Sequence, residues 1–260
     1  DEIDTHPQAA QFAELDILVQ MGVNHGFARL DQVYADVGTG AEQLEAVEAD
    51  YDITLPADKF LFGSGEVAWA RVQSALVANE FDTAEEREAV DAIVAHVYGR
   101  GLDAESSWYF DYRVIDAGMA ETFPDVTKYV TEWNTKSAEF TTDEAERFGL
   151  EQAHEMLHMV HQMTNYDVEA AHVWPVQQNT ATDLSGPEGQ TDLTVAGEMF
   201  RIMSEHLPGT YSVTMDGARP GFDEVSTLHS DYWMFAGPEK SSLFVFADAE
   251  ETEVTSLDLS

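Results

Sequence analysis

Residues 142–163 read TDEAERFGLEQAHEMLHMVHQM, and this stretch decides the fold expected of the chain. Its apolar residues recur at the period of an α-helix, about 3.6 residues per turn. On a helix of this period, one side contains Ala145, Met156, Val160 and Met163. Almost opposite lie three histidines, His154, His158 and His161. The stretch therefore predicts one long amphipathic helix with a histidine-rich side.

Within this helix, His154, Glu155 and His158 spell HExxH, the two-histidine motif of zinc metallopeptidases. Histidines four residues apart on a helix project their imidazoles to one point, where two Zn–N bonds of about 2.0–2.1 Å can form. The intervening Glu155 is the candidate general base, which would activate a zinc-bound water. The motif predicts zinc as a cofactor and His154 and His158 as its ligands.

A catalytic zinc site needs a third protein ligand and an open fourth position. Glu198, on the polar side of the next expected helix, is the candidate that best resembles the glutamate-ligand peptidases, and Glu169 and His172 are other possible donors. A second explanation of the motif requires no metal. On an amphipathic helix the apolar stripe packs inward, and the histidines then lie on the solvent-facing side, as polar residues ordinarily do.

Two extended segments precede the helix. Residues 106–115, SSWYFDYRVI, alternate with a period of two, which predicts a strand. Residues 125–142, DVTKYVTEWNTKSAEFTT, are rich in Thr, Val and aromatic residues and predict a second extended segment. Together these segments indicate a long hairpin or flap that leads directly into the helix.

This layout, over roughly residues 105–215, resembles the coat proteins of tailed viruses and the related encapsulin shells. In that family a two-stranded flap leads into a Thr/Ser-Asp-Glu helix start, matched here by Thr142, Asp143 and Glu144, and then into a long spine helix. The later polar loop, the stretch DLTVAGEMFRIMSEHL (192–207) and the strand TYSVTM (210–215) also resemble the entry to the family's second lobe. The resemblance implies a subunit without a cofactor that binds copies of itself in a closed, symmetric shell. An N-terminus at Asp1 that arises by proteolytic processing would also fit this resemblance.

The composition indicates adaptation to salt. Fifty acidic residues stand against 12 basic ones, for a formal charge of −38, yet 11% of the residues are aromatic, which is typical of a folded protein. Molar salt shortens the Debye length to about 3 Å and removes most of the self-repulsion. We therefore expect a halophile protein that has solvent cations at its acidic surface. Tight binding to DNA phosphates or to an anionic membrane is excluded, because no basic stripe is present.

The expected fold class is α+β, with a helical N-terminal region followed by a mixed helix and sheet domain. The boundaries are 1–104 for the mainly helical region and 105–260 for the α+β domain. Helices are expected over 7–35 (long or broken), 39–50, 65–80 and 83–100. The second domain is expected to contain a flap (106–141), a long helix (142–163), a polar loop (177–190), a helix (192–206) and C-terminal strands within 210–259, which include 210–217, 226–235, 241–247 and 252–259.

These observations lead to two hypotheses. The first is a structural, capsid-like shell subunit located in a virion or in the cytoplasm of a salt-accumulating halophile. The alternative is a zinc-dependent hydrolase in which His154, His158 and Glu198 bind the metal and Glu155 is the base. We expect no membrane span, because no apolar run approaches the roughly 18 residues that one requires, and no secretory signal. The chain contains no cysteine, so thiolate metal sites and disulfides are not available to it.

Overall fold

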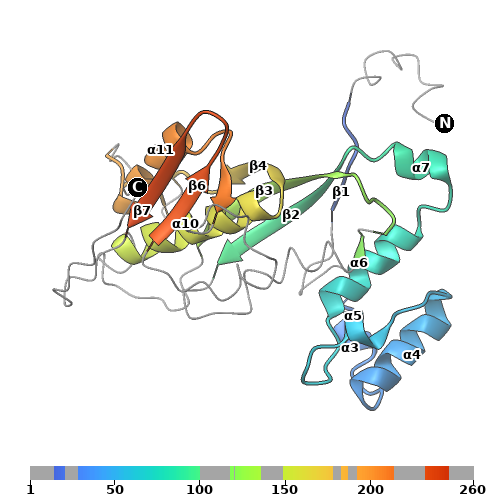
Figure 1. The fold of residues 1–260 in the computed structure, drawn as a ribbon. Coiled ribbons are helices and arrows are strands. Elements are labelled where there is room, and N and C mark those ends of the chain that lie inside the picture. Colours follow the sequence, from blue (N-terminus) through green and yellow to red (C-terminus); the bar gives the residue numbers. More distant parts are fainter. Residues whose placement is uncertain are drawn as a thin grey trace. The chain divides into compact units, whose positions relative to one another are not determined.

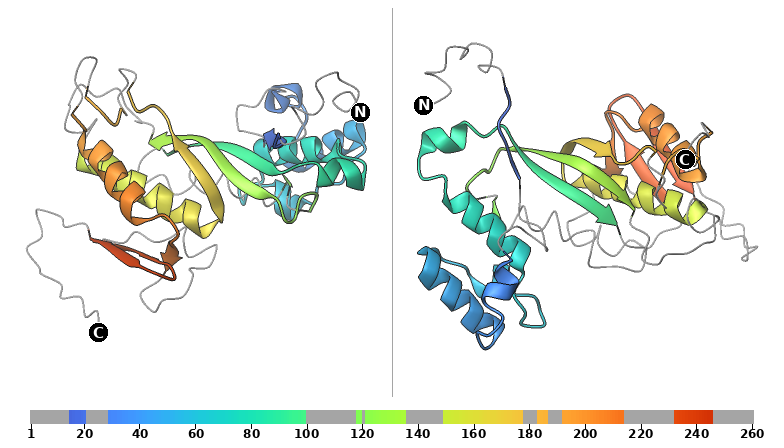
Figure 2. Two further views of the ribbon diagram at one scale, coloured as in Figure 1. Left: turned by 90° about the horizontal axis from the view of Figure 1, so that it is seen from above. Right: turned by 180° about the vertical axis from the view of Figure 1, so that it is seen from behind.

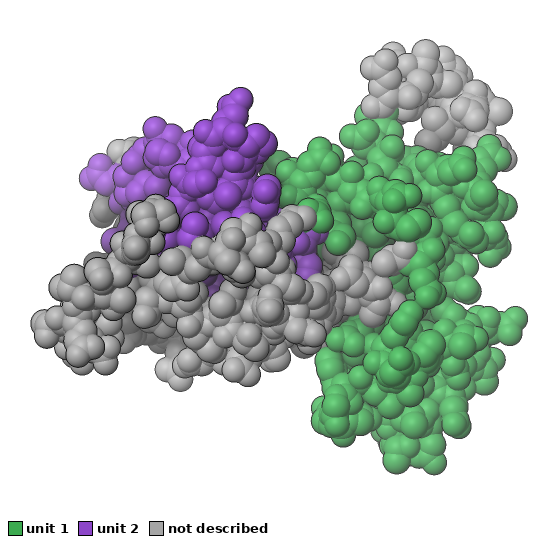
Figure 3. All heavy atoms as spheres, viewed as in Figure 1, with its two compact units in different colours: residues 1–98, 106–133, 167–174 green, residues 99–105, 134–166, 175–260 purple. Residues whose placement is uncertain are grey.

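The computed structural model describes residues 15–20, 29–99, 118–119, 121–135, 149–177, 183–186, 192–213 and 232–245. It contains helices, a parallel sheet and an antiparallel sheet, which confirms the α+β class. The chain divides into two compact units, coloured in Figure 3. Unit 1 comprises residues 1–98, 106–133 and 167–174, and unit 2 comprises residues 99–105, 134–166 and 175–260.

Four helices of unit 1 share one hydrophobic cluster. They are α3 (Leu30–Val33), α4 (Gly40–Tyr51), α5 (Ala57–Phe60) and α6 (Trp69–Asn79), and they are followed by the short helix α7 (Ala84–Glu88), which has no buried residue. The cluster consists of Leu30, Tyr34, Leu44, Val47, Leu55, Phe60, Val67, Val72 and Ala75. Capping boxes start α4 at Thr39 and α7 at Thr83. In each box the threonine side chain accepts a hydrogen bond from the backbone N–H of a glutamate three residues later, and the glutamate side chain accepts one from the backbone N–H of the threonine. The helices expected over 39–50 and 65–80 are confirmed.

A four-stranded sheet forms the rest of unit 1. Its strands are β1 (Leu18–Gln20), β2 (Ala92–Gly99), β3 (Thr127–Thr135) and β4 (Val168–Val173), in the order β1-β2-β3-β4. β1 pairs in parallel with β2, and β3 pairs in parallel with β4. Parallel neighbours require a long connection. For β3 and β4 this connection includes the long helix α10 (Leu150–Asn165).

Two of the helix predictions are wrong in part. The helix expected over 83–100 is a short helix, α7, followed by β2, because the capping box supports only the first turns and the β-branched run after Val90 favours a strand. β2 is buried at alternate positions, Ile93, Ala95 and Val97. Within the range 7–35, the structure places strand β1 at 18–20 and a helix only at 30–33, while 1–14 and 21–28 lie outside the described residues.

β3 confirms the extended segment expected over 125–142 for residues 127–135. Its two neighbours in the sheet are β2 and β4. The other arm of the expected flap, 106–115, lies outside the described residues, as does the helix start at Thr142, Asp143 and Glu144. β4 was not predicted.

Unit 2 consists of a helix pair and an antiparallel sheet. The pair is α10 and α11 (Val195–His206), and the sheet has the order β5-β6-β7, with β5 Tyr211–Val213, β6 Tyr232–Ala236 and β7 Ser241–Val245. α11 runs beside α10, and β5 and β6 also contact α10, as Figures 1 and 2 show. The helices expected over 142–163 and 192–206 are confirmed in their described parts, and the strands expected over 210–217, 226–235 and 241–247 are confirmed over shorter ranges. The segment 252–259 lies outside the described residues.

In the part of the chain that the structure describes, no helix has both the length and the apolar character needed to cross a membrane.

Candidate functional site: the histidine side of α10

Helix α10 is buried on its apolar side and on its histidine side, and this overturns one expectation from the sequence. The histidines were expected to lie on the solvent-facing side if they bind no metal. Instead, His158 is 8% exposed, His161 is 3% exposed and Glu155 is 6% exposed. The reason is that α10 is a layer between two others, since α11 contacts it and so do strands β5 and β6. Its amphipathic pattern therefore does not separate a core side from a solvent side.

The three histidines pack edge-on against aromatic rings of β6. The ring centres of His154 and Trp233 lie 4.5 Å apart at an interplanar angle of 74°, and those of His158 and Trp233 lie 6.0 Å apart at 64°. One turn further along α10, His161 contacts Phe235 at 5.4 Å and 84°. Trp233 and Phe235 are two residues apart on a strand, so they lie on the same face of the sheet. These contacts define the histidine side of α10, which consists of His154, His158 and His161.

The burial of His161 decides its charge. Loss of hydration disfavours the imidazolium and lowers the pKa of His161 to about 4. At neutral pH this ring is therefore uncharged, and it contributes an apolar surface to the contact with Phe235. Next to it, Thr164 of α10 accepts a hydrogen bond from the backbone N–H of Ser212 at 3.1 Å, which ties the end of the helix to β5.

The residues of the HExxH motif fit a zinc site only in part. His154 and His158 lie on the same side of the helix, against the same indole ring, as an i, i+4 ligand pair must. However, their Nε2 atoms are shielded from solvent.

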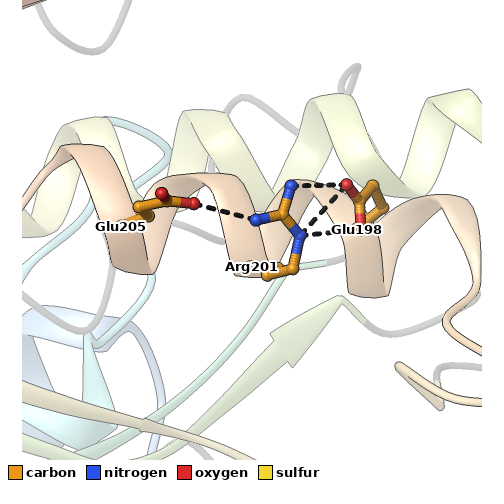
Figure 4. Close-up of polar contacts among 3 residues, drawn as sticks. All are labelled: Glu198, Arg201 and Glu205. Carbon is orange, nitrogen blue, oxygen red and sulfur yellow. Dashed lines mark hydrogen bonds and ion pairs between the residues drawn. The ribbon is translucent and has the colours of Figure 1, made fainter.

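The predicted third ligand is engaged elsewhere. The Glu198 carboxylate accepts hydrogen bonds from Nε and an Nη of Arg201 at 2.7–3.1 Å, and another Nη donates to Glu205 at 2.8 Å (Figure 4). The bonds from Arg201 lower the pKa of Glu198. All three side chains lie on the exposed side of α11. The other suggested donors, Glu169 and His172, lie on β4 in unit 1. Among the described residues, no three His, Asp or Glu side chains lie close enough together to bind a metal.

One polar cluster was missed by the sequence analysis. In unit 1, the Tyr98 hydroxyl donates to Glu132 Oε2 at 2.9 Å, and His96 Nδ1 lies 3.5 Å from the same oxygen. On the helix expected over 83–100, His96 and Tyr98 would point about 200° apart. On strand β2 they share a face. In the sequence, the alternation of the apolar residues Ile93, Ala95 and Val97 with His96 and Tyr98 was the signal that could have revealed the cluster.

Comparison of the chain with protein-family models, with curated proteins and with solved structures found no match. Its function must therefore be argued from its own geometry.

Proposed function

We propose that the protein is a structural subunit of a closed, symmetric shell that is adapted to high salt and found in a virion or in the cytoplasm of a salt-accumulating halophile. Copies of the same chain are its partners. The observation that supports this proposal best is the use of the HExxH residues as packing groups. In unit 2, Glu155 and His158 of the motif and the nearby His161 are buried on α10, which contacts α11 and strands β5 and β6, so we interpret them as packing groups between these layers.

Exposed aliphatic residues give unit 2 a surface that could be buried between copies. Val176, Leu193 and Val195 are 57%, 47% and 48% exposed. Their segments are held together by backbone hydrogen bonds through Leu184, whose N–H donates to Val176 and whose carbonyl accepts from Thr194, both at 3.0 Å. Burial of apolar surface is worth about 25 cal/mol per Å², so contacts between copies at such residues would stabilise an assembly.

The charge of −38 fits assembly in concentrated salt. Two copies repel each other strongly in dilute buffer, because each has a large excess of carboxylates. In molar salt the Debye length is about 3 Å, so the repulsion between surfaces that are not in direct contact is largely screened. The proposal therefore predicts that assembly depends on salt and that the particles dissociate on dilution.

Size-exclusion chromatography followed by electron microscopy in multimolar KCl tests this proposal. We expect closed particles of uniform diameter that elute far ahead of a 28.8 kDa chain. Glu155→Gln, which replaces the carboxyl group of the proposed base with an amide of similar shape, should form the same particles. A uniform monomer in both proteins at every KCl concentration would contradict the proposal.

The alternative that we retain is a zinc-dependent hydrolase in which His154, His158 and Glu198 bind the metal and Glu155 is the base. The observation in its favour is that His154 and His158 share one side of α10. This alternative makes two requirements. Both imidazoles must turn away from Trp233, and the Glu198 carboxylate must release Arg201. Metal analysis after purification without chelators tests it, with about one zinc per chain as the expected result and zinc-free protein as the result against it.

A further inference from the structure

Two basic side chains meet at the start of α6, in unit 1. Arg71 lies in the first turn of this helix, and its Nη1 donates a hydrogen bond to the backbone carbonyl of Lys59, in α5, at 2.7 Å. The guanidinium carbon of Arg71 lies 5.6 Å from the centre of the Phe62 ring, within the range of a cation–π contact. The Lys59 side chain is 43% exposed, and Phe62 is 37% exposed. We call Lys59, Phe62 and Arg71 the basic patch.

The basic patch has the composition of a protein-binding surface. The chain contains 12 basic residues against 50 acidic ones, so few places on it can hold an anionic partner. Arginine and aromatic residues contribute most to binding at protein interfaces. Next to Phe62 the chain turns through a tight loop, in which the N–H of Gly65 donates to the carbonyl of Phe62 at 2.8 Å. A Cβ atom added at Gly63 or at Gly65 would meet no atom of the described residues within 4 Å, so this loop leaves room for a partner.

Lys59 already forms an ion pair within the chain. Its Nζ lies 3.0 Å from Oε1 of Glu121, whose side chain is 90% exposed. Exposed ion pairs contribute little free energy. A carboxylate of another molecule can therefore join or replace Glu121 with little loss.

The helix α7 has the charge that complements the basic patch. Four of its five residues are charged, three of them glutamates, and none of its residues is buried. Glu86 closes the capping box, and Arg87 donates to two backbone carbonyls that precede the helix. Glu85 and Glu88 are exposed and lie three residues apart, which places them on the same side of the helix. Because helices in proteins obtain most of their stability from packing, a partner that covers α7 would stabilise it.

The basic patch and α7 lie at opposite ends of α6 (Figure 1). α6 has 11 residues and is therefore about 16 Å long. Arg71 lies in its first turn, whereas α7 begins only after its last residue, Asn79. The two surfaces therefore do not neutralise each other within one copy. Surfaces of this kind meet head to tail between copies, and such contacts generate a ring when the rotation between copies closes.

We propose that the basic patch of one copy binds α7 of a second copy. The cations of the patch pair with Glu85 and Glu88, and Phe62 packs against the aliphatic parts of these side chains. This contact rests on the proposed shell function, because it requires a second copy of the chain. It also suits concentrated salt. At a Debye length of about 3 Å the repulsion between the remaining surfaces is screened, whereas charge-assisted hydrogen bonds of about 2.7–2.9 Å are shorter than that length.

Charge reversal followed by mixing tests the contact. Light scattering in multimolar KCl gives the concentration at which the full chain assembles. We expect Lys59→Glu, and separately the double variant Glu85→Lys/Glu88→Lys, to raise this concentration at least about tenfold, because each places like charges against each other. An equal mixture of the two variants should assemble as the wild type does, because every contact between alternating copies again joins opposite charges. Phe62→Ala should also raise the concentration at least about tenfold.

Two control variants isolate the effect. Glu121→Gln removes the ion pair of Lys59 within the copy, and Lys240→Glu reverses the charge of an exposed lysine in unit 2. Both should assemble like the wild type. Circular dichroism of each variant checks that it folds, and recovery of assembly in the mixture shows independently that both charge-reversed variants are folded.

The possible results separate this contact from the shell function. Assembly of Lys59→Glu and Phe62→Ala at the wild-type concentration would overturn the basic patch, while the shell proposal would stand. A mixture of the charge-reversed variants that does not assemble would overturn α7 as the partner. A wild type that forms only small oligomers, which Lys59→Glu abolishes, would contradict the shell and support the contact. A monomeric wild type at every salt concentration would contradict both.

Discussion

Acid should weaken the folded protein through one identified histidine. His161 is buried against Phe235 and has a pKa of about 4, while a histidine in the unfolded chain has a pKa near 6.5. The folded state therefore binds fewer protons than the unfolded state between these two values. The contribution of neutral, buried His161 to the free energy of unfolding is fully present above about pH 6.5 and is lost as the pH falls through 4.

The size of this effect follows from the two pKa values. At pH 5, protonation of the unfolded chain favours unfolding by about 2 kcal/mol, and below pH 4 the loss approaches about 3 kcal/mol. Because carboxylates also titrate in this range, the effect of His161 must be measured as a difference between variants. His161→Gln keeps a polar side chain of similar size but does not titrate.

Urea unfolding in concentrated KCl, monitored by circular dichroism at pH 7.5 and pH 5, measures the difference. We expect the wild type to lose about 2 kcal/mol more than His161→Gln between these two values. His206→Gln, which removes an exposed histidine, should behave like the wild type. An equal loss in the wild type and in His161→Gln would refute the inference that His161 is held neutral by burial.

Three further predictions concern packing, capping and charge. Gly197→Ala should cost about 2 kcal/mol of unfolding free energy, because a Cβ at this position would collide with the carbonyl oxygen of Leu184; a urea midpoint equal to that of the wild type would disprove the close approach. Thr39→Ala should cost about 1 kcal/mol by removing the capping box with Glu42, while Thr39→Ser should restore most of it in the same assay. Dilution from multimolar KCl to about 0.1 M should lower the midpoint of thermal unfolding, because the Debye length grows from about 3 to 10 Å and the carboxylates repel one another; a midpoint independent of salt would contradict the assignment to a high-salt environment.

Local signals in the sequence were sufficient for several elements of the fold. The helical period of residues 39–50 predicted α4 almost to the residue, and the structure adds a capping box at Thr39. The same type of box at Thr83 was misleading, because it starts a helix of five residues and not a long one. The run Ala92–Val97 is compatible with both a helix and a strand when its partners are unknown. Pairing with β1 and β3, which are distant in sequence, decides that it is a strand.

The candidate site shows the same limit. The sequence predicted that His154, His158 and His161 share one side of a helix, and their contacts with β6 agree with this. It could not show that Trp233 and Phe235, more than 70 residues later, cover that side. Nor could it indicate His96 and Glu132, because they meet only through the pairing of β2 with β3. Contacts between distant segments are therefore what the sequence alone left undetermined.

The mass of the protein in solution tests the proposed function most directly. Light scattering in multimolar KCl gives this mass without immobilisation, and stepwise dilution of the salt in the same cell gives its dependence on charge screening. The proposal predicts a particle in the megadalton range that dissociates as the salt is removed. A constant mass near 28.8 kDa, or near twice that value, at every salt concentration would contradict it.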